Sequence, residues 1–218
     1  GEIGSGKTTV CRMLLNQLNP NTKVSLILNT HLSAKELIST VLDDLGLEPV
    51  KGTKSRLLGQ LNSFLLEELS HDNNIVLLID EAQNLARNVL EEIRMLSNLE
   101  TEKEKLIQIV LIGQPELRDK LRMRNLEQFK QRITLRYHLS PLDRAETEGY
   151  IRHRLTKASN NGVEIFTKDS IDKIYDYSQG IPRLINLVCD RALLNGYIYN
   201  KETIGIDIIE ESIKENEI

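Results

Sequence analysis

The feature that most constrains the fold is the segment at the start of the chain, which reads GEIGSGKT over residues 1–8. It matches the pattern G-x-x-x-x-G-K-[ST], in which glycines let the backbone turn tightly and point its N–H groups at phosphate oxygens. Usual residue frequencies produce such a match by chance about 1% of the time in a chain of this size. The motif therefore predicts a phosphate-binding loop at the start of a helix.

The loop residues have distinct expected roles in binding a nucleoside triphosphate. Lys7 is expected to reach the β- and γ-phosphates, and the Thr8 hydroxyl is expected to ligate Mg²⁺. The following helix would add its positive dipole end, and its apolar side chains at 10, 13, 14 and 18 would hold the loop against a sheet. The residues expected to bind ATP here are Gly1, Gly4, Ser5, Gly6, Lys7, Thr8 and Thr9.

Strand and helix patterns alternate along the first 140 residues. Short apolar runs bounded by polar residues predict strands at 24–28, 75–79, 106–112 and 133–138. Helical patterns lie at 7–18, 33–45, 55–70 and 89–99, with two short ones at 115–123 and 125–131. This alternation predicts an α/β fold with a parallel sheet flanked by helices. Because only helical patterns follow, we predict a nucleotide-binding core at 1–140 and a small all-helical lid domain at 141–218.

Two carboxylates follow the apolar run at 75–79. Asp80 and Glu81 would stand at the carboxyl edge of a parallel sheet, where ligands bind. Asp80 can then hold the Mg²⁺ shell, and Glu81 can polarise an attacking water. Taken alone, the pair could be an ordinary polar turn. Beside a phosphate-binding loop it predicts Mg²⁺-dependent ATP hydrolysis, because a kinase that transfers phosphate to a substrate must exclude water.

Composition narrows the class further. Hydrophobic residues make up 40% of the chain and charged residues 28%, which is typical of a globular protein. The net charge of -4 does not favour attraction of the whole protein to nucleic acid or anionic lipid. Cys11 and Cys189 lack metal-ligand spacing and are expected to be buried, reduced thiols. No apolar run approaches the length of a membrane span.

With these motifs in place, the chain resembles the AAA+ ATPases and, within them, the accessory ATPases of type II secretion. The segments that carry the resemblance are GEIGSGKTTVCRMLLNQL, LLIDEAQNL, VLIGQPELRDKL, QRITLRYHLSPL and SQGIPRLINLVCDRALL. Related transposition ATPases share much of this set. The resemblance implies an AAA+ core with a helical lid, assembled into an oligomer, with a ring expected. It also implies a strand upstream of the loop, between the strands predicted at 106–112 and 133–138. A chain beginning at Gly1 would then expose two strand edges.

The resemblance also assigns roles to further side chains. Gln114 stands where the family has a first sensor for the γ-phosphate or the attacking water, although it could be a turn residue before Pro115. Arg183 matches a second sensor on a lid helix, or else is a solvated arginine. Arg132 matches an arginine finger that acts on a neighbouring subunit's nucleotide, with Arg136 as the reserve candidate.

The stretch between Arg118 and Arg136 holds seven basic and two acidic residues. Three interpretations remain open for it: a solvated face, a subunit interface, or a contact with DNA. The leading function is an ATPase that drives assembly or remodelling of a secretion-pathway complex. Its partners would then be membrane proteins of that machinery, at the cytoplasmic side of the inner membrane. The alternatives are a DNA-transposition or DNA-recruitment ATPase and a slow nucleotide-gated switch.

Overall fold

The computed structural model describes residues 1–158 and 164–216. Contacts divide the chain into two compact units. We call Lys7–Tyr137 the sheet unit, and Gly1–Gly6 with His138–Ile218 the helical unit. The sequence places a boundary after residue 140, whereas the contacts divide the chain after Tyr137. The loop residues Gly1–Gly6 join the helical unit because their contacts run to its side chains and backbone.

The sheet unit contains three parallel strands in the order β1-β2-β3. These strands are β1 (Thr22–Ile27), β2 (Asn74–Ile79) and β3 (Gln108–Leu111). β2 lies in the centre, and its residues from Ile75 to Ile79 are all buried, as expected for a strand covered on both faces. The parallel sheet and its flanking helices confirm the predicted α/β class.

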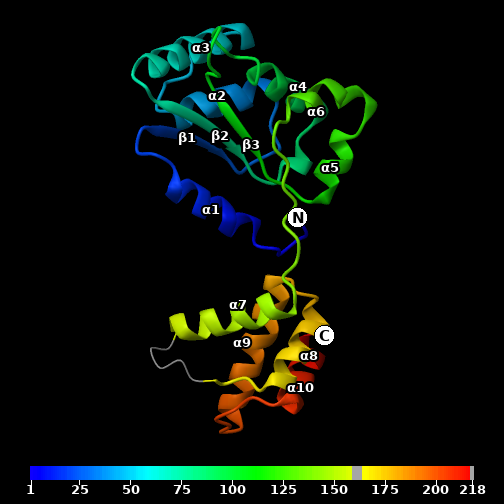
Figure 1. Ribbon diagram of the computed structural model, residues 1–218. Coiled ribbons are helices and arrows are strands. Elements are labelled where there is room, and N and C mark those ends of the chain that lie inside the picture. The colour runs from blue at the N-terminus through cyan, green and yellow to red at the C-terminus, as the bar shows by residue number, and fades with distance from the viewer. Residues whose placement is uncertain (159–163, 217–218) are drawn as a thin grey trace. The chain divides into compact units, whose positions relative to one another are not determined.

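Helices α2 (Ala34–Asp44) and α3 (Lys54–Ser70) contact β1 and β2 and lie together over the sheet (Figure 1). A capping box starts α2, because the Ser33 side chain accepts from the Glu36 N–H and the Glu36 carboxylate accepts from the Ser33 N–H. The remaining elements are η1 (Ala82–Asn84), α4 (Arg87–Leu96), α5 (Pro115–Leu121), η2 (Arg124–Leu126) and α6 (Glu127–Arg132).

The outer edge of β1 is capped by a side chain. One carboxylate oxygen of Asp44, at the end of α2, accepts from the Leu26 N–H and from the Ser25 hydroxyl, each at 3.0 Å. The Ile27 carbonyl points the other way and accepts from the Asp80 N–H of the neighbouring strand, so the Leu26 N–H faces outward. Asp44 thereby covers a donor that an edge strand would otherwise expose.

The strand predicted at 133–138 is wrong. These residues form no strand, and the Leu135 and Tyr137 side chains are 89% exposed. A strand needs a hydrogen-bonded neighbour, and β2 is the only strand with which β3 pairs among the described residues. Residues 133–138 therefore have no ladder to join, and β3 itself is shorter than predicted.

Helix α1 (Lys7–Gln17) also differs from expectation. Its predicted apolar face is largely exposed, since Val10 is 50% and Met13 56% accessible to solvent. Only Cys11 is buried in this helix. The main core cluster lies between the sheet and helices α2 to α6, whereas α1 lies on the other side of the sheet (Figure 1). The apolar face therefore does not hold the loop in the way that the sequence predicted.

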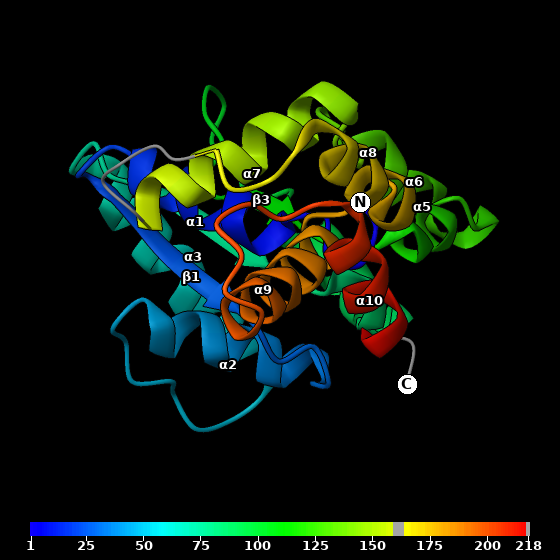
Figure 2. The same cartoon turned by 90° about the horizontal axis from the view of Figure 1, so that it is seen from below.

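The helical unit contains four helices among its described residues: α7 (Arg144–Ala158), α8 (Lys168–Ser178), α9 (Pro182–Ile198) and α10 (Ile206–Asn216). α9 contacts the other three (Figure 2). Their apolar side chains form a separate core. Gly180 joins α8 to α9 with φ +73, and a Cβ there would stand 1.8 Å from the Leu142 carbonyl oxygen. Only glycine therefore fits this turn.

Both cysteines are buried free thiols, as predicted. Burial raises the pKa of Cys189 to about 12, which keeps this thiol protonated at neutral pH. No helix in the described ranges 1–158 and 164–216 is long and apolar enough to cross a membrane.

Candidate active site

The predicted acidic pair stands at the carboxyl end of β2. Asp80 is 7% exposed, and its carboxylate accepts from the Glu81 N–H at 2.8 Å. Glu81 adopts φ 50 and ψ 35, the left-handed region that costs a residue with a side chain about 1 kcal/mol or more. This turn carries the chain from β2 into η1.

Two amide side chains hold the Glu81 carboxylate. Its Oε2 accepts from Gln83 Nε2 at 2.5 Å and from Gln114 Nε2 at 3.0 Å. Gln114 follows β3 and lies 33 residues further along the chain. The structure therefore brings together Glu81 and Gln114, which the sequence had assigned to hydrolysis and to sensing.

No sequence motif assigns a role to Gln83, which also belongs to this cluster. Besides its bond to Glu81, its Oε1 accepts from the Gln114 backbone N–H at 3.1 Å. The sequence feature that could have indicated a role for Gln83 is its position two residues after Glu81. A polar side chain just beyond a buried strand lies near the edge of the sheet where ligands bind.

Backbone bonds join the ends of β2 and β3 as well. The Ala82 N–H donates to the Ile112 carbonyl at 2.8 Å, and the Ile112 N–H donates to the Ile79 carbonyl at 2.9 Å. Lys120 of α5 donates from Nζ to the Gln83 and Leu85 carbonyls at 2.6 and 2.9 Å. Lys120, one of the seven basic residues, thus stabilises the backbone of η1.

The two candidate arginine fingers, Arg132 and Arg136, lie on the surface of the sheet unit. Arg132 ends α6 and is exposed. The pKa of Glu100 is lowered chiefly by a hydrogen bond from Lys105 and more weakly by the positive charge of Arg132. Arg136 donates to the Lys130 carbonyl at 2.7 Å from a segment without strand structure. Because this segment is not a strand, the alternation of side chains along a strand cannot predict which way Arg136 faces.

The first turn of α1 supplies Lys7, Thr8 and Thr9. Cys11, one turn beyond Thr8, has a pKa raised by burial and, more weakly, by the negative charge of Asp80. The charge of Asp80 therefore acts on the Cys11 thiol of α1. Hydroxyl and carboxylate oxygens are the donors that Mg²⁺ prefers, so Thr8 and Asp80 suit such an ion chemically.

The glycines of the phosphate loop adopt the conformations that its motif demands. Gly4 and Gly6 have φ +80 and +96, where a side chain is strained. The Ser5 hydroxyl is buried and has no hydrogen-bond partner among the described residues. A buried hydroxyl without a partner carries a desolvation cost that a phosphate oxygen would relieve. The loop of this chain thus fits a phosphate group.

Arg183 meets the phosphate loop within the helical unit. Its N–H donates to the Gly4 carbonyl at 3.2 Å, at the start of α9. A Cβ on Gly4 would stand 2.6 Å from the Arg183 Cβ, so the close approach requires glycine at this position. The residue expected to act as a second sensor is therefore beside the loop.

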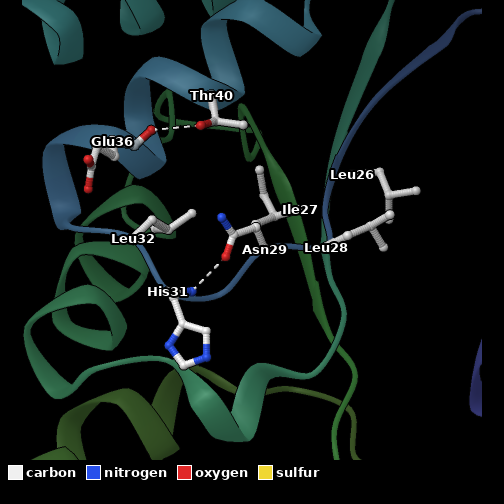
Figure 3. A pocket seen from close by; sticks show the side chains of 8 residues that line it. All are labelled: Leu26, Ile27, Leu28, Asn29, His31, Leu32, Glu36 and Thr40. Atoms are coloured by element: carbon white, nitrogen blue, oxygen red, sulfur yellow. Dashed lines mark hydrogen bonds between the residues drawn. The ribbon is translucent and has the colours of Figure 1, made fainter.

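A separate cavity of about 440 Å³ lies at the carboxyl end of β1 (Figure 3). Ile27, the last residue of β1, and Leu28, directly after it, line one side, and Glu36 and Thr40 of α2 also line it. The His31 N–H donates to the Asn29 side chain at its mouth. None of the residues to which the motifs assign a role lines this cavity.

Comparison with known proteins places the chain in a family. The family described as AAA domain matches residues 1–121. General secretion pathway protein A of Aeromonas hydrophila is 46% identical over 198 residues, which cover 90% of this chain and 36% of that protein. An uncharacterized HTH-type transcriptional regulator of Methanocaldococcus jannaschii is 28% identical over 66% of this chain and 36% of its own length. The chain thus spans about a third of the curated relatives it matches.

Solved structures share the fold at low sequence identity. Cdc6p of Pyrobaculum aerophilum has a TM-score of 0.71 and 19% identity, covering 99% of this chain and 59% of that one. The Drosophila ORC structure bound to DNA has a TM-score of 0.66 and 16% identity, covering 99% of this chain and 53% of that one. The family match over more than half of the chain and the shared fold lead to one conclusion: this chain belongs to the AAA+ family of ATPases.

Proposed function

We propose that the chain binds ATP with Mg²⁺, hydrolyses it, and uses the energy to assemble or remodel a secretion-pathway complex as part of an oligomer. The observation that carries the hydrolytic part is the Glu81 carboxylate, held at the end of β2 by amides from Gln83 and Gln114. A carboxylate at this edge of a parallel sheet, in a chain with a phosphate loop, suits activation of water.

The loop would hold the nucleotide. Backbone N–H groups of residues 4–8 and the Ser5 hydroxyl would bind phosphate oxygens, and Lys7 would reach the β- and γ-phosphates. Thr8 and Asp80 would hold Mg²⁺, which supplies charge neutralisation at those phosphates when it is bound. Arg183, whose backbone N–H donates to the Gly4 carbonyl, would add a cation from α9.

Hydrolysis needs a group that orients water and accepts its proton. In this proposal water attacks the γ-phosphorus, its proton passes to Glu81, and the bond to the β-phosphate oxygen breaks to release ADP and phosphate. The Gln114 amide nitrogen carries two N–H donors, and the bond to Glu81 uses one of them. The other donor could reach the γ-phosphate, which would give Gln114 its sensor role.

The secretion role rests on the similarity to general secretion pathway protein A, 46% over 198 residues. Partners would then be membrane proteins of that machinery, met at the cytoplasmic face of the inner membrane. The shared part covers only 36% of that relative, so the proposal concerns the ATPase part of such a protein.

A DNA-directed ATPase is the second candidate. Exposed basic side chains favour it, since α5, η2 and α6 present Arg118, Arg122, Arg124, Lys130 and Arg132 to solvent. The descriptions of two similar proteins, an HTH-type transcriptional regulator and ORC bound to DNA, also favour a DNA-directed role. The net charge of -4 and the lack of aromatic residues among the basic ones in 118–124 disfavour it.

ATP hydrolysis with and without duplex DNA separates the two candidates. For the secretion role, the rate at about 50 mM salt should not change when DNA is added. A DNA-directed enzyme should show stimulation that fades towards about 200 mM salt, because phosphate contacts release counterions. Stimulation that Arg122→Ala and Arg124→Ala reduce would favour the DNA role.

Replacing Lys7 tests nucleotide binding. Lys7→Ala should weaken ATP binding about 10-fold or more, because a charge-assisted contact to phosphate is lost. The measurement is a fluorescent-nucleotide titration, with circular dichroism to confirm that the fold is retained. Lys35→Ala is the matched control, since Lys35 is exposed in the first turn of α2. Equal affinities for Lys7→Ala and wild type would remove the phosphate-loop assignment.

Replacing the acidic pair separates binding from chemistry. Glu81→Gln should bind ATP and Mg²⁺ but hydrolyse ATP about 10²-fold more slowly, the usual scale for a lost general base. Asp80→Asn should instead raise the Mg²⁺ concentration needed for half-maximal rate. Phosphate release measured over a Mg²⁺ series checks both, with the exposed Glu67→Gln on α3 as a control. A wild-type rate for Glu81→Gln would assign water activation to another residue.

Replacing Arg132 tests whether subunits share an active site. Arg132→Ala should bind ATP normally yet hydrolyse it about 10³-fold more slowly, if the arginine acts on a neighbour's nucleotide. Mixing it with Lys7→Ala protein should restore activity where an intact loop meets an intact Arg132. Wild-type activity should rise faster than linearly with protein concentration while subunits assemble. Linear activity and no recovery on mixing would mean that Arg132 is not the finger.

A further inference from the structure

Gln83 forms a bridge between the ends of two strands. It lies in η1, directly beyond β2, and its side-chain nitrogen donates to Glu81 Oε2 at 2.5 Å. Its side-chain oxygen accepts from the Gln114 N–H, which follows β3, at 3.1 Å. One amide side chain thus contacts both residues to which the proposed reaction assigns a role.

The bridge acts on one oxygen of the Glu81 carboxylate. Both amides, from Gln83 and Gln114, donate to Oε2, and neither uses Oε1. This asymmetric anchoring occupies Oε2 and leaves Oε1 without an amide donor. An oxygen with spare lone pairs is what proton transfer from water requires.

The backbone at Glu81 makes this anchoring necessary. Its left-handed conformation is one that a glutamate leaves readily unless its surroundings hold it. The Glu81 N–H is held by Asp80, but the carboxylate at the far end of a flexible side chain depends on the two amides. Loss of the Gln83 donor would let the carboxylate sample other rotamers.

The Gln83 main chain is held independently of its side chain. Lys120 binds the Gln83 carbonyl, and the preceding residue, Ala82, donates to Ile112 on the neighbouring strand end. A substitution of the Gln83 side chain therefore leaves the path of η1 supported, and its effect reports on the amide group.

We propose that Gln83 is a positioning residue for ATP hydrolysis: it holds Glu81 Oε2 so that Oε1 faces the attacking water. The inference rests on the proposed function and deepens it, because Gln83 acts only through Glu81. Its loss should lower kcat and leave nucleotide binding nearly unchanged, since neither bond of its side chain involves the phosphate loop.

Two variants test the amide. Gln83→Met keeps the length of the side chain but removes both bonds. Gln83→Glu keeps an acceptor for the Gln114 N–H but replaces the donor with a negative oxygen beside Glu81. Both should lower kcat roughly 10- to 100-fold with little change in KM, the scale for a reacting group displaced by about 1 Å.

The matched control is Gln60→Met. The Gln60 side chain makes an equivalent pair of bonds in the sheet unit, donating to the Glu48 carbonyl at 2.9 Å and accepting from the Val50 N–H at 3.0 Å. Its loss should leave kcat unchanged. Thermal unfolding of all three variants shows whether the Gln83 variants lose more stability than this control.

A double variant distinguishes positioning from general damage to the fold. In single-turnover experiments with enzyme in excess, Gln83→Met should slow the wild type but should not slow Glu81→Gln any further. Residues that act through one group are non-additive, whereas damage to the fold would lower the residual rate as well.

The measured rates decide whether Gln83 positions Glu81. A wild-type kcat for Gln83→Met, or a raised KM at unchanged kcat, would overturn the inference. So would a further loss of rate in the Glu81→Gln background. If Glu81→Gln itself hydrolyses ATP at the wild-type rate, the proposed function fails and the inference fails with it. If Glu81→Gln is slow while Gln83→Met is normal, only the inference fails.

Discussion

The positions of Asp80, Glu81 and Gln114 depend on the parallel register at Ile79. This residue, the last of β2, is paired with Ile27 of β1 on one side and Leu111 of β3 on the other. The three strands therefore end at one edge. That edge therefore collects Asp80 and Glu81, directly after β2, and Gln114, three residues after β3. Burial of β2 on both faces holds the register, since a slip by one residue would change which side chains each face buries.

Buried carboxylates join α3 to the sheet and α4 to α3. Glu68 of α3 is 6% exposed and pairs with Lys23 of β1 at 2.8 Å. A hydrogen bond from Lys23 is the main cause of the lowered pKa of Glu68, and burial opposes it. Glu92 of α4 is similarly buried and pairs with Lys54 of α3 at 2.5 Å. Removing either lysine would leave a buried carboxylate without its cation, so these pairs specify which elements lie together, α3 with β1 and α4 with α3, more than they add stability.

The sequence predicted the elements whose signals are local. The apolar run at 75–79 required a buried strand, and its two carboxylates could then be placed from the general rule that ligands bind at strand ends. Residues 133–138 were mispredicted because strand structure depends on a hydrogen-bonded neighbour, which an apolar pattern does not reveal. The exposed apolar face of α1 was also mispredicted, because an apolar pattern on a helix does not reveal whether another element covers that face. The role of Gln83 was not predicted, because its contact with Glu81 arises from a left-handed turn at Glu81. No residue pattern predicts such a turn at a glutamate.

The carboxylate of Asp44 has a consequence for how this sheet can associate. Its bonds to the Leu26 N–H and the Ser25 hydroxyl occupy part of the outer edge of β1. A strand that paired along this edge would have to take the Leu26 N–H from the Asp44 carboxylate. The side chain that disfavours such pairing is thus one carboxylate at the end of α2.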